Sequence, residues 1–223
     1  MTGRILLTGF EPFGATPINP AEQVARALDG VRLGDWEVVS AIVENSFGRS
    51  IAQVSEAMKE CRPDLVVMLG EYGGRTMITL ERFAHNHDDS VRYDLDDNAG
   101  VRLAGQPVVD GGPLAYRSTL PLHAITKALR TAGVPADISD TGGTNVCNHL
   151  LYGVLHHISE EELPVRAGWI HLPHLPEVAA LDSYLGAPSM ALETSVLGVR
   201  TAIETAIAHE QDDPAPPRSC WQI

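Results

Sequence analysis

The chain has 223 residues, of which 44% are hydrophobic and 20% are charged, and its formal net charge is -13. This composition is typical of a globular protein with one sizeable core. The few Lys and Arg residues are scattered, which excludes the basic surface that nucleic-acid binding requires. Hydrophobic runs stay far below the roughly 18 residues of a membrane span, so we expect neither nucleic acid nor membrane as a partner.

The three cysteines are Cys61, Cys147 and Cys220, an odd number at irregular spacing without a Cys-x-x-Cys pair. This pattern argues against a disulfide framework and against a zinc site built on paired cysteines. Free thiols fit a reducing compartment, so we expect a cytoplasmic protein that needs no metal and no cofactor.

Short β-rich runs alternate with helical patterns along the chain. We expect strands over residues 4–8, 37–43, 65–69, 77–84, 136–139 and 168–171. We expect helices over residues 20–29, 48–60, 122–132, 146–158 and 190–208. The alternation predicts one α/β domain over residues 1–210, a three-layer α/β/α sandwich around a twisted, largely parallel sheet. Residues 86–116 are predicted to be a long loop with at most a hairpin, and residues 211–223 a flexible, proline-rich tail.

Cys147 follows a glycine turn, Gly142 and Gly143, at the start of a helical pattern. With Thr144 or Asn145 as the N-cap, the thiol would lie among unpaired backbone N–H groups, near the positive end of the helix dipole. Such a position favours a thiolate nucleophile and supplies donors for an oxyanion. On this segment alone, however, a small buried structural cysteine is the commoner explanation.

A cysteine nucleophile needs a base and a group that orients the base. His171 ends a short apolar strand, where open α/β sheets assemble their sites, and is the best candidate base. Alternation within residues 77–84 places Glu81 on the same face as Met77, Thr79 and Phe83, and a buried carboxylate there needs a partner such as an imidazole. Two alternatives are an exposed Glu81 on an edge strand and a structural ion pair with Arg75 or Arg82.

Two further patterns are weaker. A metal site could be suggested by His171, His174 and Glu177. Pro173 and Pro176, however, make this segment extended and not helical, so we give a metal site less weight than a catalytic His171. The glycine-bounded loop after the first strand carries Phe10 and Phe13, which could form an apolar wall for a ligand or could cap the core.

Taken together, these segments resemble the pyroglutamyl peptidase I (pyrrolidone-carboxylate peptidase) family of cysteine peptidases, over residues 3 to 209. The motifs that carry the resemblance lie at residues 9–14, 73–76, 81–82, 111–116, 118–121, 143–149 and 170–173. The resemblance implies a Glu81–His171–Cys147 triad that hydrolyses the amide bond after an N-terminal pyroglutamyl residue through a thioester. It also implies pyroglutamyl peptides as substrates and a homo-oligomer, either tetramer or dimer.

The resemblance also suggests how substrate is held. It implies an oxyanion contact from Arg92, and the implied substrate-binding residues are Phe10, Phe13, Glu71, Tyr93, Asn145 and Val146. The chain departs from the family pattern around these positions. Asn145 stands where Phe or Tyr is usual, Glu71 where Gln is usual and Asp140 where Asn is common, and residues 91–97 form a longer loop.

Two alternatives remain, and the first follows from these departures. The same thiol machinery could act on a different amide if Tyr93 of the longer loop does not replace the aromatic wall lost at position 145. A non-catalytic protein that binds a small molecule could keep the fold with an unreactive Cys147.

Overall fold

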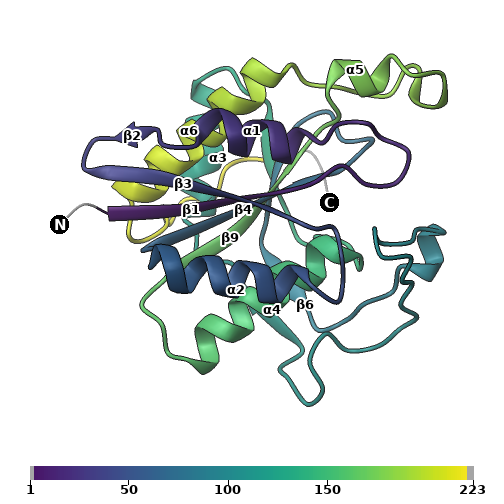
Figure 1. Ribbon diagram of the computed structural model, residues 1–223. Helices are drawn as coiled ribbons and strands as arrows, with labels where there is room; N and C mark the ends of the chain where they lie inside the picture. Colours follow the sequence, from purple (N-terminus) through teal and green to yellow (C-terminus); the bar gives the residue numbers. More distant parts are fainter. Residues whose placement is uncertain (1–2, 220–223) are drawn as a thin grey trace.

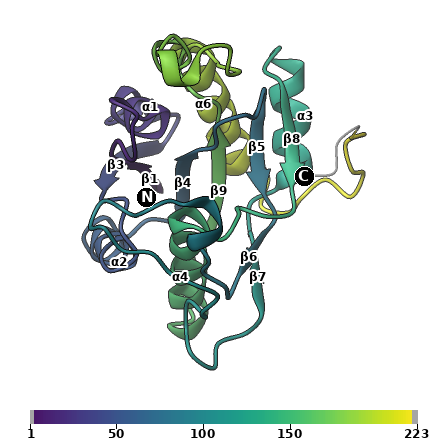
Figure 2. The same ribbon diagram turned by 90° about the vertical axis from the view of Figure 1, so that its right-hand side faces the viewer.

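A computed structural model describes residues 3–219, so Cys220 lies outside the described residues. A seven-stranded sheet in the order β2-β3-β1-β4-β9-β5-β8 is covered by helices on both faces (Figure 1), and a separate pair, β6 and β7, lies below it (Figure 2). The strands are β1 (Gly3–Phe10), β2 (Arg32–Leu33), β3 (Trp36–Val43), β4 (Leu65–Glu71), β5 (Ile78–Glu81), β6 (Phe83–His85), β7 (Ala115–Arg117), β8 (Ala136–Ser139) and β9 (Arg166–Leu172). The predicted three-layer α/β class is confirmed.

The sheet reverses direction beside β9. Strands β3, β1, β4 and β9 are parallel, whereas β5 pairs antiparallel with β9 and parallel with β8. The run 77–84, predicted as one strand, is divided at Arg82 into β5 in the main sheet and β6, which pairs with β7. The reversal places Thr79 opposite His171 and Glu81 opposite Trp169.

All five predicted helices are present and bury their apolar faces against the sheet. Three cover one face, namely α1 (Pro20–Leu28), α3 (Leu122–Thr131) and α6 (Leu192–Ala208), and two cover the other, α2 (Ser50–Cys61) and α4 (Val146–Glu160). The start of α1 is as predicted, because Asn19 caps it by accepting a hydrogen bond from Ala21 N at 2.9 Å. No helix among residues 3–219 is both long and apolar enough to cross a membrane.

Three short helical turns were not predicted: η1 (Val91–Tyr93), α5 (Pro176–Ala179) and η2 (Asp182–Tyr184). The first of them lies in the long segment 86–116, which folds back on itself. Ser90 and Leu103 form a closed base, since Ser90 N donates to Leu103 O at 2.8 Å and Leu103 N donates to Ser90 Oγ at 3.0 Å. Residues 91–102 therefore form a loop whose two ends are fixed together.

The chain after α6 packs against α3 as far as the structure describes it. The N-cap of α3, Pro121, provides no side-chain hydrogen bond. Asp212 supplies this cap from the tail, because its carboxylate accepts from His123 N at 2.9 Å and from Ala124 N at 3.1 Å. Two N–H groups that the helix cannot satisfy internally are thereby paired. The expected flexibility of residues 211–223 can therefore be tested through Asp212.

We predict that Asp212→Ala lowers the free energy of unfolding by about 1 kcal/mol, the usual effect of losing a helix cap. Urea denaturation of the variant and the wild type measures the difference. Glu210→Ala is the matched control, because Glu210 is an exposed carboxylate on the same segment. If Asp212→Ala is as stable as the wild type, the carboxylate of Asp212 does not stabilise α3 as a cap, and the prediction is wrong.

Candidate active site

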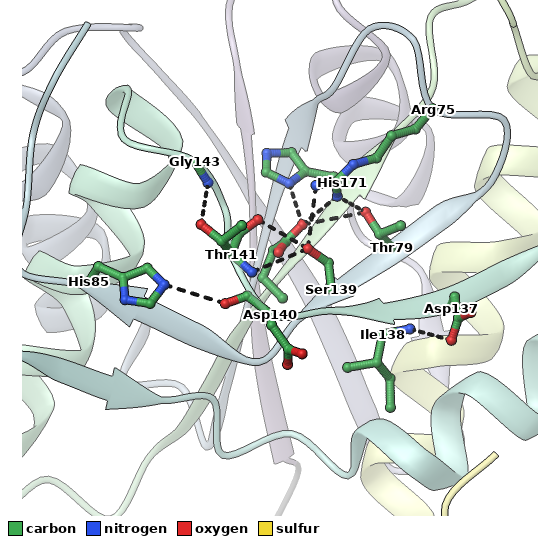
Figure 3. A network of polar contacts seen from close by, with 11 residues as sticks. Arg75, Thr79, His85, Asp137, Ile138, Ser139, Asp140, Thr141, Gly143 and His171 are labelled. Atoms are coloured by element: carbon green, nitrogen blue, oxygen red, sulfur yellow. Dashed lines mark hydrogen bonds and ion pairs between the residues drawn. The ribbon is translucent and has the colours of Figure 1, made fainter. Parts of the chain in front are cut away.

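The site is built around the buried carboxylate of Glu81 at the end of β5. Both Glu81 and His171 of β9 are almost completely buried, and His171 Nδ1 donates to Glu81 Oε1 at 2.7 Å. Figure 3 shows the His171 ring directed toward this network between β5 and β9. The other ring nitrogen, Nε2, is buried and has no hydrogen-bond partner among the described residues. An imidazole held in this way has one free nitrogen that can accept a proton.

Arg75 is the second partner of the same carboxylate. Its Nη1 donates to Glu81 Oε1 at 2.6 Å and also contacts Thr79 Oγ1, and its Nη2 donates to Ser139 Oγ at 3.3 Å (Figure 3). The guanidinium carbon lies 3.8 Å from the centre of the Tyr72 ring. The sequence offered an imidazole or Arg75 as alternative partners of Glu81, and the structure shows both at once. Arg82 instead pairs with Asp140 at 3.0 Å.

The charges of this cluster follow from its contacts. Burial alone would raise the pKa of Glu81, but the hydrogen bond from His171 and the charges of His171 and Arg75 outweigh it and lower that pKa. Burial, aided by the charge of Arg75, lowers the pKa of His171 below its ordinary value despite the favourable contact with Glu81. These contacts favour the ionised form of Glu81 and the neutral form of His171.

Cys147 lies in the first turn of α4. Gly143, with a φ of 84°, makes the left-handed turn that leads into the helix, and Asn145 is the N-cap that accepts from Val146 N at 2.9 Å. Asn148 fixes the same turn to β6, since it accepts from His85 N at 2.8 Å and donates to His85 O at 2.9 Å. These contacts hold the thiol at the open end of the helix, as the sequence predicts.

A cavity of about 220 Å³ joins Cys147 and His171. Its lining comprises Phe13, Asn45, Glu71, Tyr72, Gly73, Tyr93, Leu95, Gly142, Gly143, Thr144, Asn145, Val146, Cys147 and His171. The exposed surface of this lining is mainly apolar, with few polar groups, as is usual for a small-molecule site.

Cys147 is half-buried, and its surroundings favour the protonated thiol. Burial, with the negative charges of Glu81 and Glu71, raises the pKa of Cys147 to about 12, against the lowering effects of Arg75 and of the residue's own backbone N–H. The sequence led us to expect a thiolate favoured by the helix terminus. The structure differs because two carboxylates and burial act more strongly on this thiol than the first turn of the helix.

The longer loop forms the outer wall of the cavity. Asp97 is buried and accepts from Phe47 N at 2.8 Å, and Asn98 Nδ2 donates to Glu11 Oε1 at 2.7 Å and to Pro12 O at 2.9 Å. These contacts attach the loop to the segment that carries Phe13. Tyr93 and Leu95 thereby line the cavity together with Phe13.

Two candidates from the sequence lie away from the cavity lining. Phe10 is buried in the core, with its ring centre 5.7 Å from that of Trp169. Its position on β1, and not on the following loop, explains this burial. Arg92 is exposed and its guanidinium lies 5.0 Å from the centre of the Tyr93 ring. The other substrate-binding candidates, Phe13, Glu71, Tyr93, Asn145 and Val146, line the cavity.

The residues of the weaker metal pattern do not form a metal-binding group among the described residues. His171 binds Glu81, His174 Nδ1 donates to Glu71 Oε1 at 2.6 Å, and Glu177 is exposed at the start of α5. The Glu71–His174 pair was not predicted, because nothing in the spacing of residues 71 and 174 links them. Likewise, no sequence pattern predicts the contacts of Asn148, which is distinguished only by its position directly after Cys147.

Three comparisons place the chain among known proteins. The family model described as pyroglutamyl peptidase matches residues 3–209. The chain is 54% identical over 217 residues to the pyrrolidone-carboxylate peptidase of Mycobacterium bovis, covering 96% of this chain and 98% of that protein. It is 43% identical over 208 residues to the corresponding Bacillus mycoides protein, covering 93% and 94%.

Solved structures agree. The crystal structure of pyroglutamyl peptidase I from Bacillus amyloliquefaciens has a TM-score of 0.91 and 38% identity, and the match covers 96% of this chain and 100% of that one. A mutant pyrrolidone carboxyl peptidase from Pyrococcus furiosus has a TM-score of 0.87 and 37% identity, covering 92% and 98%. The chain belongs to the pyroglutamyl peptidase family and is a peptidase, a hydrolase of amide bonds.

Proposed function

We propose that this protein is a cysteine exopeptidase, an omega peptidase that hydrolyses the amide bond after an N-terminal pyroglutamyl residue. The observation that carries this proposal is the buried Glu81–His171 pair with a free Nε2, in the wall of a cavity that also contains Cys147. The apolar cavity supports a substrate residue that is cyclic and bears no charged amine. The names of the relatives support the same substrate class.

The resting thiol and the neutral imidazole define the order of proton transfers. His171 Nε2 removes the proton as Cys147 Sγ attacks the pyroglutamyl carbonyl, and the imidazolium then gives this proton to the leaving amine. Water hydrolyses the thioester with His171 again as the base. The Cys147 N–H lies in the first helical turn, where it has no acceptor within the helix, and it donates to the oxyanion. One such donor contributes about 3 kcal/mol to transition-state stabilisation.

Glu81 and Arg75 act through His171. The Glu81 carboxylate fixes the ring with Nδ1 protonated and stabilises the imidazolium that forms during attack. Arg75 holds this carboxylate in place from the other side, and its charge adds to the burial that lowers the pKa of His171. We therefore assign Arg75 as a positioning residue.

We predict that the wild type releases the arylamine from pyroglutamyl-7-amido-4-methylcoumarin and that Cys147→Ser and His171→Ala each reduce kcat/KM by at least about a thousandfold. The first replaces the thiol with a much weaker nucleophile, and the second removes the base that accepts its proton. Fluorescence assays on purified protein measure this. Arylamides of alanine and glutamate serve as comparison substrates. Full turnover by the Cys147→Ser variant would refute the proposed nucleophile.

The protonation states predict two different pH profiles. Because the pKa of His171 is depressed, kcat/KM should hold at neutral pH and fall only below pH 6.5, the ordinary histidine value. Alkylation of Cys147 by iodoacetamide requires the thiolate, so its rate should still be rising above pH 9. Coincidence of the two profiles at acidic pH would indicate a resting thiolate–imidazolium pair and contradict this mechanism.

We predict that Arg75→Gln moves the acidic limb of kcat/KM to higher pH, because the positive charge that lowers the pKa of His171 is lost. The activity should therefore fall more at pH 6 than at pH 8. Arg82→Gln is the matched control, since Arg82 pairs with the exposed Asp140 outside this cluster. If the acidic limb of kcat/KM in Arg75→Gln coincides with that of the wild type, the electrostatic role assigned to Arg75 is wrong.

A further inference from the structure

Asn45 places an unpaired amide in the wall of the cavity. The residue lines the cavity and is only 4% exposed. Its side-chain oxygen and nitrogen make no hydrogen bond with any described residue, yet neither atom is completely enclosed by protein. The small surface that the amide keeps is therefore the surface that faces the cavity. An amide buried to this degree without a partner is costly, so it favours a ligand that pairs with it.

The backbone that carries this amide is fixed to the loop 91–102. Asn98 N donates to Asn45 O at 2.9 Å, and Phe47 N donates to Asp97 Oδ2 at 2.8 Å. The loop thus holds the segment at two points, one at Asn45 itself and one two residues later. The position of the amide in the wall is set by these contacts and does not require a ligand.

Asn45 and Phe13 lie at the same end of the cavity. Strands β1 and β3 are parallel neighbours, and Glu11 N donates to Val43 O at 3.0 Å where the two strands end. Asn45 and Phe13 each follow this contact by two residues. His171 comes from β9, which is separated from β1 by β4. A ring bound between Phe13 and Asn45 can therefore direct its exocyclic carbonyl toward the side of the cavity that holds His171.

The other polar side chains near Asn45 in the lining are partly or wholly engaged. Thr144 Oγ1 donates to Asp89 O at 2.9 Å, and Asn145 Oδ1 accepts from Val146 N at 2.9 Å. Among the described residues of the lining, Asn45 is thus the only carboxamide whose donor and acceptor are both free. A ligand that satisfies it must offer an acceptor and a donor together.

We propose that Asn45 is a specificity-determining residue that recognises the lactam edge of the substrate, an inference that rests on the proposed function. The five-membered ring of pyroglutamate forces the lactam N–H and C=O onto one edge, and a primary carboxamide presents its own N–H and oxygen in the same way. Two parallel hydrogen bonds form. The lactam N–H donates to Asn45 Oδ1, and Asn45 Nδ2 donates to the lactam oxygen.

This pairing selects a neutral cyclic amide. Neither partner carries a charge, so no ion has to be desolvated in the apolar cavity. Proline has the same ring size but lacks the lactam oxygen, and an open-chain glutamyl residue has a charged amine in place of the lactam N–H. Each of them leaves one or both atoms of the Asn45 amide unpaired, and a buried polar group without its partner discriminates strongly between substrates.

The first experiment measures how small ring compounds protect Cys147 from iodoacetamide at about pH 9. 2-Pyrrolidone has the complete lactam edge, whereas cyclopentanone has the same ring and carbonyl without the N–H. In the wild type, 2-pyrrolidone should give equal protection at a concentration at least about tenfold lower. This preference should be lost in Asn45→Leu and in Asn45→Asp. It should persist in the matched control Ser46→Ala, because Ser46 is the next residue, is buried and lies outside the lining.

Hydrolysis provides the second measurement. In Asn45→Asp, kcat/KM for pyroglutamyl-7-amido-4-methylcoumarin at about pH 8 should fall at least about tenfold, because the ionised carboxylate has no donor for the lactam oxygen and repels it. This variant keeps the shape of the side chain, so it decides the question even if Asn45→Leu does not fold.

Equal protection by the two ring compounds in the wild type, or an unchanged preference in Asn45→Asp, would overturn the inference. The proposed function is tested separately, since it fails only if the wild type does not cleave the pyroglutamyl substrate. A wild type that cleaves this substrate but does not prefer 2-pyrrolidone over cyclopentanone would leave the peptidase in place and remove the role of Asn45.

Discussion

The site depends on one buried oxygen, Glu81 Oε1, which accepts hydrogen bonds from both His171 and Arg75. A carboxylate in the interior is unstable unless donors compensate its lost hydration. Here the compensation comes from two elements, because β9 brings the imidazole and the turn before β5 brings the guanidinium. The same contacts that allow the charge to be buried also orient His171, the proposed base, so one cluster serves both folding and the proposed mechanism.

The balance of charges around Cys147 is the less expected part of the site. A helix terminus and a nearby Arg75 favour a thiolate, but Glu81 and Glu71 with burial favour the thiol. A neutral thiol is less exposed to oxidation and alkylation than a thiolate. In the proposed mechanism, a thiol that keeps its proton until a carbonyl is in place reacts only when His171 can accept that proton.

Much of this could be predicted from the sequence, because it follows from local patterns. Alternation placed Glu81 on a buried face, and the glycine turn placed Cys147 at a helix start. The reversal of β5 beside β9 could not be predicted, since strand direction depends on long-range pairing. The Glu71–His174 pair joins residues 103 positions apart, and only the assembled sheet brings them together. Phe10 was assigned to a loop because strand ends are uncertain by a few residues.

The hydrogen-bonded base of the loop 91–102 allows the loop to change independently of the Glu81 cluster. Ser90 and Leu103 hold the ends together, so insertions and substitutions between them leave β6, α4 and the Glu81 cluster in place. Tyr93 and Leu95, which line the cavity, lie within this variable part. Changes in the loop alone can therefore reshape the wall of the cavity without moving the residues proposed for bond cleavage.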